Sequence, residues 1–300
     1  KIMHDIIYSF HMPLFLVISG YIYSVTRRAD GYLNFIQKKI NRLMIPYFTV
    51  SIVVIVVKII SEQFLIVDNP TEMWSFVEMF YLPSAGYYLW FIWVLFILFA
   101  IVPFFKSKRA HIILGTICLA LYFSPYEMPD IFCLAQFQQN SIYFVMGMII
   151  HDYKKMFGKL ANSPIAIYLV LFIATNIFLI SSSESNMQRI AFLCTASFGT
   201  ILVMQISKIV NNKYHKLNGV LLSLSGASYF IYLFHTTFEG FAKAVIFKLS
   251  IFHSNGALFT VGAILVVCAG VIIPYILYRL VQKNKLLSLL FGVENKAIAK

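Results

Sequence analysis

The stretch YSFHMPLFLVISGYIY, residues 8–23, is apolar and long enough to form most of a membrane-crossing helix. About 20 consecutive apolar residues span the hydrocarbon core of a bilayer as an α-helix. His11 and Pro13 lie near the start of this stretch, and proline is tolerated there because neighbouring groups satisfy the freed backbone. Ser19 and Gly20 offer a small surface for close helix packing. We therefore expect a membrane helix over residues 6–25.

The composition extends this conclusion to the whole chain. Of 300 residues, 60% are hydrophobic and only 12% are charged, whereas soluble domains are about half apolar and a quarter charged. The net charge of +12 lies in short clusters between apolar runs, which indicates membrane topology rather than nucleic-acid binding. The sequence has no GxSxG, Walker A, GxGxxG or HExxH motif, and its four cysteines have no metal-ligand spacing. The composition predicts an all-α, polytopic membrane protein without a metal.

Nine apolar runs separated by short connections predict the topology. Connections 26–43, 106–109, 151–162, 208–219 and the C-terminal tail each hold at least three Lys or Arg, and the alternate connections hold one or none. The positive-inside rule then places residue 1 outside and the C-terminus in the cytoplasm. Segment 26–47 is basic and amphipathic, so we expect an interfacial helix there. The predicted spans of this single domain, residues 1–300, cover about 6–25, 44–66, 87–105, 110–126, 134–151, 163–182, 190–208, 220–250 and 256–281.

Ionisable residues inside these runs are functional candidates, because charge is expensive in a membrane. His235 and Glu239 lie four residues apart and would share one helical face. The carboxylate could hold the imidazole in one tautomer, as a general base requires, or the pair could join two helices. Lys58 and Glu62 have the same spacing and could neutralise each other near the interface. His11 is either a satisfied interior histidine or a chemical group.

Other polar and aromatic residues have weaker predictions. Trp90 and Trp93 favour an interfacial aromatic belt, with a sugar pocket as the alternative. Gln136, Gln139 and Asn140 should face a cavity or the protein interior, because they have no reason to face lipid. The remaining histidines should be solvated or interfacial: His4, His111, His151, His215 and His253.

The segment IIYSFHMPLFLVISGYIYS resembles acyltransferase family 3, and is most similar to its fucose O-acetylase and Nod-factor acetyltransferase branch. Weaker similarities follow in the family's order: FIQKKINRLMIPYF, YYLWFIWVLFILF, YFVMGMIIHDYKK and LSLSGASYFIYLFHTTF. Four residues match family positions within these segments: His11, Arg42, Trp90 and His235.

The resemblance implies a ten-helix core in the bacterial inner membrane. Such a core transfers an acyl group, usually acetyl, from cytoplasmic acetyl-CoA or a similar thioester to an extracytoplasmic carbohydrate. The family's proposed catalytic histidine lies in its first helix, with an associated arginine upstream, and neither has a counterpart here. Because the sequence begins with Lys1 rather than Met, we expect an N-terminally truncated chain that is inactive by itself.

The chemistry assigns expected roles to the remaining candidates. Acyl transfer needs a base for the hydroxyl proton, for which His11, His235 and Glu239 are candidates. The CoA phosphates need cations, and Arg42 is the best candidate among a basic group that includes Arg27, Arg28, Lys38 and Lys39. Trp90, Gln136 and Asn140 are candidate substrate-binding residues. The partners expected are lipid and a carbohydrate acceptor. A polysaccharide exporter on the same scaffold, or a structural subunit of a glycan-assembly complex, remains an alternative.

Overall fold

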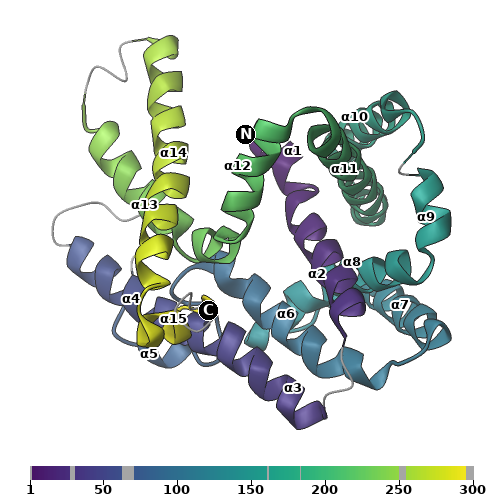
Figure 1. Cartoon of the computed structure of the whole chain (residues 1–300), viewed down its shortest axis with the longest axis horizontal. Coiled ribbons are helices and arrows are strands. Elements are labelled where there is room, and N and C mark those ends of the chain that lie inside the picture. Colours follow the sequence, from purple (N-terminus) through teal and green to yellow (C-terminus); the bar gives the residue numbers. More distant parts are fainter. Residues whose placement is uncertain are drawn as a thin grey trace. The chain divides into compact units, whose positions relative to one another are not determined.

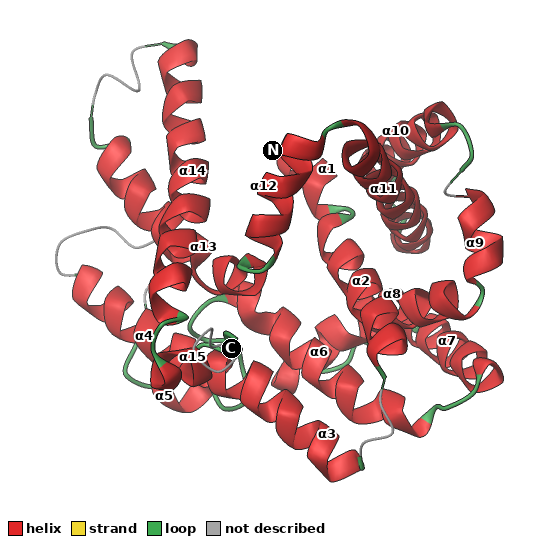
Figure 2. Cartoon of the chain, in the orientation of Figure 1, coloured by secondary structure: helices red, strands yellow, loops and turns green. Residues whose placement is uncertain are grey.

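The structure is a computed structural model that describes residues 2–27, 31–62, 71–160, 162–182, 184–249 and 255–294. Every regular element in these ranges is helical, and none is a strand (Figures 1 and 2). The predicted all-α membrane bundle is confirmed. Of the residues named above, Lys1, Arg28 and His253 lie outside the described residues, as does the side chain of His4.

The structure supports five to seven of the nine predicted spans. By length and composition, five helical runs qualify within the described ranges: Asp5–Thr26, Tyr32–Ser61, Tyr87–Phe104, Asn186–Lys213 and Gly256–Val281. Two bent pairs qualify if each is one span, namely α9 with α10 (Lys154–Leu160, Ile165–Ser181) and α12 with α13 (His215–Ser225, Ser228–Ile246). The second pair bends by 78° between Ser225 and Ser228.

The two other predicted spans differ from expectation. The run at 110–126 forms α7 (Lys108–Tyr122), whose 15 residues rise about 1.5 Å each and fall short of a bilayer core. The run at 134–151 forms α8 (Leu134–Asp152), which carries four amide side chains in its first two turns. Neither helix meets the length and composition of a span.

The chain forms two compact units, and the first comprises Lys1–Tyr32 and Ile97–Asn218. In this unit α2 (His11–Thr26) packs along α8, α7 packs on α8, and α10 packs on α11 (Ser185–Lys213) (Figure 1). Two glycines bring the α2 and α8 backbones together. A Cβ on Gly20 would collide with the Phe144 carbonyl, and one on Gly147 would collide with the Val17 carbonyl. The small packing surface predicted at Gly20 is therefore confirmed.

The second unit comprises Leu33–Phe96 and Gly219–Lys300. Within it α13 packs along α14 (Gly256–Val281), and α15 (Lys285–Leu290) packs on α4 (Ile45–Ser61). The segment expected as a separate interfacial helix instead runs without a break from α3 (Tyr32–Lys39) through a π-helical turn, Ile40–Met44, into α4.

The remaining elements of the described chain are α1 (Ile2–Tyr8), α5 (Ser75–Glu78), α6 (Trp90–Ile101) and the 3₁₀ turns Tyr87–Leu89, Val102–Phe104 and Ile131–Cys133.

Candidate functional site

The candidate site of the second unit centres on His235, in the middle of α13. Its Nδ1 lies 2.8 Å from the Tyr232 carbonyl oxygen. A carbonyl only accepts hydrogen bonds, so Nδ1 must carry the proton. In the neutral ring this leaves the lone pair on Nε2, which is the atom that can accept a proton. The sequence analysis offered Glu239 as one possible partner that fixes the tautomer, whereas in the structure the helix backbone bonds to Nδ1.

Two tyrosines enclose the imidazole. Tyr88, in the 3₁₀ turn Tyr87–Leu89, donates its hydroxyl to the Leu233 carbonyl at 3.0 Å. Tyr232 donates its hydroxyl to the Tyr88 carbonyl at 2.5 Å. The Tyr88 ring meets the His235 ring edge-on, with 5.5 Å between centroids. These reciprocal bonds join the turn before α6 to α13 beside the histidine, and we name Tyr88 and Tyr232 the tyrosine clasp.

Glu239 lies one turn beyond His235 and contacts α14. Gly270 makes room for it, because a Cβ there would come within 2.5 Å of Glu239 Cγ and 2.6 Å of Oε1. The carboxylate is therefore seated against α14 on the helical turn that follows the imidazole. The predicted shared position on α13 is confirmed, and the use of that pair in chemistry stays a prediction.

Arg42 and the two tryptophans occupy different environments of the same unit. Arg42 lies in the π-helical turn with its side chain 66% exposed, and its Nη2 is 3.9 Å from Glu294 Oε1. Trp90 begins α6 half-buried and meets Phe91, with 6.1 Å between ring centroids. Trp93 is 9% exposed and packs against Tyr47. The interfacial belt is therefore wrong for Trp93, because its ring belongs to the protein core.

The other candidates lie in the first unit. His11 Nδ1 donates to the Ile7 carbonyl at 3.0 Å. Gln136 donates to Asp130 Oδ1 at 3.3 Å, and Asn140 donates to the Gln136 carbonyl at 2.9 Å. Both amides are half-buried, but Gln139 is exposed, so its predicted inward orientation is wrong. The described geometry thus divides the candidates, with His11, Gln136 and Asn140 in one unit and Arg42, Trp90, His235 and Glu239 in the other.

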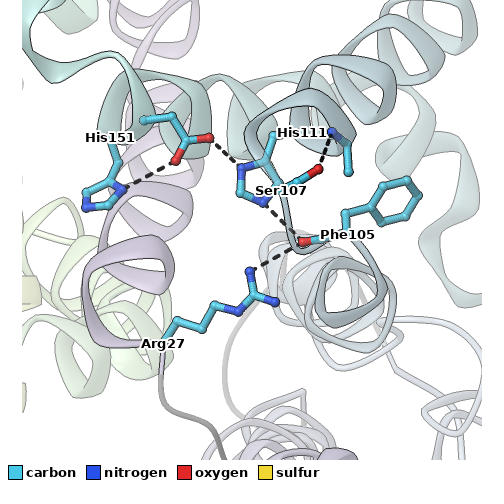
Figure 3. Close-up of polar contacts among 7 residues, drawn as sticks. Arg27, Phe105, Ser107, His111 and His151 are labelled. Carbon is cyan, nitrogen blue, oxygen red and sulfur yellow. Dashed lines mark hydrogen bonds and ion pairs between the residues drawn. The ribbon is translucent and has the colours of Figure 1, made fainter.

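A second polar cluster, also in the first unit, was not expected from the sequence (Figure 3). His111, predicted to be solvated, is 5% exposed. Its Nδ1 lies 2.6 Å from Asp152 Oδ2, and its Nε2 lies 3.1 Å from the Phe105 carbonyl. Arg27 Nη1 donates to the same carbonyl at 3.4 Å, and His151 Nδ1 lies 3.7 Å from Asp152 Oδ1.

This cluster, which we call the histidine clasp, is built to hold elements together. Both His111 ring nitrogens face acceptors, so both bonds form only when the ring is doubly protonated and positively charged. The Phe105 carbonyl occupies Nε2, so the ring has no atom left to act as a base. The clasp ties the end of α2, the connection before α7 and the end of α8. Both His111 contacts thus hold the clasp together, whereas the Nδ1 contacts of His235 and His11 each leave Nε2 as the proton acceptor of the neutral ring.

Comparison with known proteins identifies the family. A family model described as an acyltransferase domain matches residues 1–279. The chain belongs to acyltransferase family 3. No curated protein and no solved structure matches it. The family supports membrane O-acyltransfer in general, as the resemblance of the opening segment implied.

For a family 3 acyltransferase, the structure adds residues that sequence reasoning missed. Tyr88 and Tyr232 stand two before Trp90 and three before His235, but nothing in a single sequence shows that Tyr88 bonds to the Leu233 carbonyl and Tyr232 to the Tyr88 carbonyl. Gly270 lay unnoticed in the middle of an apolar run. Gln138, among the α8 amides, was passed over although it is the buried one. One feature of the sequence distinguishes Gln138 from Gln136: it lies two residues further along and therefore on a different face of the helix.

Proposed function

We propose that this protein transfers an acetyl or similar acyl group from acetyl-CoA, or a related acyl-CoA, to a hydroxyl of a surface polysaccharide or glycolipid. Membership of acyltransferase family 3 supports the reaction class. The single observation that carries the site is His235, whose Nδ1–H is bound to the Tyr232 carbonyl at 2.8 Å. The neutral ring then presents Nε2 as a proton acceptor.

The chemistry follows from this tautomer. The acceptor hydroxyl attacks the thioester carbonyl, a C–O bond forms as the C–S bond breaks, and Nε2 takes the hydroxyl proton. The same proton can pass from Nε2 to the departing thiolate, so the His235 imidazole returns to its neutral state. Glu239, one turn away on α13, stabilises the imidazolium between these steps. Each role is a proposal about His235 and Glu239, in addition to the family's histidine that has no counterpart in this sequence.

The binding roles rest on residue chemistry. Arg42 is exposed in its π-helical turn, and such turns occur often at functional sites. Its guanidinium can hold a CoA phosphate through two parallel hydrogen bonds. Trp90, at the start of α6 in the second unit, offers a ring face for a sugar. Gln136 and Asn140, in the first unit, are proposed separately as substrate-binding amides. The family resemblance favours a bacterial inner membrane, and the alternation of basic and non-basic connections favours a cytoplasmic C-terminus.

Deletion of the gene tests the reaction class. The surface glycan of the deletion strain would be purified, quantified and examined by NMR for O-acyl signals. Loss of these signals with an unchanged amount of polymer supports the acyltransferase. Loss of surface polymer with acylation retained would contradict it and favour the exporter.

Point variants in the complemented strain test the residues. His235→Gln and Glu239→Gln should lower O-acylation at unchanged membrane expression, with a loss of about a hundredfold for the histidine because general bases contribute on that order. His215→Gln, at an exposed position on α12, is the matched control and should retain full acylation. Normal acylation in both site variants would reduce His235 and Glu239 to packing residues.

A further inference from the structure

The sequence predicts no role for Tyr88, yet in the structure this residue contacts both the imidazole of His235 and the α13 backbone beside it. Its hydroxyl reaches the Leu233 carbonyl, its own carbonyl receives the Tyr232 hydroxyl, and its ring lies against the imidazole. Tyr88 therefore contacts both the α13 backbone at Leu233 and the imidazole of His235 itself.

The carbonyl that fixes the His235 tautomer belongs to Tyr232, the other residue of the tyrosine clasp. Tyr232 presents its carbonyl to His235 Nδ1 and its hydroxyl to the Tyr88 carbonyl. The Tyr232 ring also lies 6.1 Å from the His235 ring, measured between centroids. A rotation of α13 at Tyr232 would disturb both bonds at once, and the bonds from Tyr88 oppose that rotation.

The enclosing rings restrict the imidazole in a second way. Tyr88 stands edge-on to His235 at an interplanar angle of 72°, while Tyr232 is tilted by 31°. Turning the imidazole about its Cβ–Cγ bond would drive it into one of these rings and break the Nδ1–H bond. The ring orientation is thus selected by packing as well as by the hydrogen bond.

We propose that Tyr88 is a positioning residue that keeps His235 in its Nδ1–H tautomer, with Nε2 as the proton acceptor. The hydroxyl of Tyr88 acts through the α13 backbone and its ring acts on the imidazole face. The catalytic consequence rests on the proposed function, whereas the tautomer itself does not. Without the tyrosine clasp the imidazole can flip or exchange its proton between nitrogens, so fewer molecules present an unprotonated Nε2.

The test uses the full-length protein labelled with ¹³C,¹⁵N-histidine in detergent micelles or lipid. The ring carbon and nitrogen shifts distinguish the two neutral tautomers, and comparison with His235→Gln assigns the His235 signal among those of the other histidines. The wild type and Tyr87→Phe, the control at the adjacent exposed tyrosine of the same turn, should show Nδ1–H. Tyr88→Phe, which keeps the ring but loses the hydroxyl, should show a mixture of tautomers.

Kinetics give the second readout. In Tyr88→Phe, kcat should fall about tenfold to a hundredfold with little change in the KM for acyl-CoA, because misplacing a reacting group has effects of this size. The acid limb of the kcat/KM profile should move as well. Tyr232→Phe breaks the same clasp from the other side and replaces Tyr88→Phe if that variant does not fold.

An unchanged His235 tautomer in a folded clasp variant would overturn the proposal, whatever the activity. If the tautomer changes while His235→Gln remains active, Tyr88 positions the ring but the proposed base role is wrong. The two failures are therefore separable by measurement.

Discussion

At the scale of single residues, Gln138 shows how one amide can organise a connection. Its Nε2 donates to the Leu121 carbonyl at 3.0 Å and to the Tyr126 carbonyl at 2.8 Å, and its Oε1 accepts from Met128 N at 2.9 Å. The side chain is 5% exposed. These three bonds join α8 to the end of α7 at Leu121 and to the connection between the two helices at Tyr126 and Met128.

We predict that Gln138→Ala lowers the free energy of unfolding by roughly 2 kcal/mol, because three hydrogen bonds made by a buried amide are lost. The neighbouring Gln139 is exposed, so Gln139→Ala should change stability by less than about 0.5 kcal/mol. Thermal unfolding of both variants in the same detergent measures the difference. Equal stabilities would show that water replaces the amide without cost.

Cys133 gives a prediction about reactivity. The residue is fully buried in the 3₁₀ turn before α8, and burial, followed by the nearby charge of Asp130, raises the pKa of its thiol to about 12. The thiolate is the reacting form, and at pH 8 it would be roughly one part in ten thousand. Maleimide should therefore label Cys133 only after unfolding, as measured by mass spectrometry. Rapid labelling of the folded protein would contradict this burial.

At the scale of elements, the histidine clasp joins the end of α2, the connection before α7 and the end of α8. His111 and Asp152 are nearly excluded from solvent, with side chains 6% and 10% exposed. Burying charge is expensive, and removal of one partner leaves the other uncompensated. The pair therefore has a larger effect on stability than an exposed ion pair of the same geometry.

We expect His111→Ala and Asp152→Ala each to destabilise the protein by about 3–5 kcal/mol, the range for breaking a buried pair. His151→Ala removes a contact of 3.7 Å and should cost less than about 1 kcal/mol, as weak ion pairs do. Urea or thermal unfolding of the three variants provides the comparison. If His151→Ala destabilised the protein as much as His111→Ala, the His111–Asp152 pair would not be the main stabilising contact of the cluster.

The elements also show what the sequence could predict. Apolar runs located the helices well, because lipid exposure imposes a uniform signal along each one. The apolar runs could not distinguish α7 and α8 from membrane spans, because an apolar run shows neither how long the helix will be nor whether it packs against lipid or protein. His111 and Trp93 were wrongly placed because each was assigned to a membrane boundary by its sequence position. Both are buried by contacts with segments distant in the chain, which periodicity does not report.

For the molecule as a whole, the first unit accounts for the one exception to the charge alternation. Arg189 is the only basic residue in a connection predicted to lie outside. Its Nη1 donates to the Ser124 carbonyl at 2.8 Å, and Tyr122 donates to the Arg189 carbonyl at 2.8 Å. Arg189 is thus held by the connection between α7 and α8, which is also predicted to be outside.

The topology can be tested with single cysteines in a cysteine-free background. The connections after α2, before α7 and after α8 meet at the histidine clasp, so Lys106→Cys and Lys155→Cys should both face the cytoplasm. Tyr126→Cys, at an exposed position, should face outside. An impermeant thiol reagent should label only Tyr126→Cys in intact cells, and all three after permeabilisation. Labelling of Lys106→Cys and Lys155→Cys but not of Tyr126→Cys in intact cells would show that the orientation is the reverse of the predicted one.

The glycine contact between α2 and α8 has a consequence for transport through the first unit. Where Gly20 faces the Phe144 carbonyl and Gly147 faces the Val17 carbonyl, backbone meets backbone with no side-chain layer between them. Side chains can change rotamer and open a passage, but main chains in contact cannot. A lipid tail or acyl chain therefore has no route between these two helices. Any path for the transferred group must follow another face of α2 or α8.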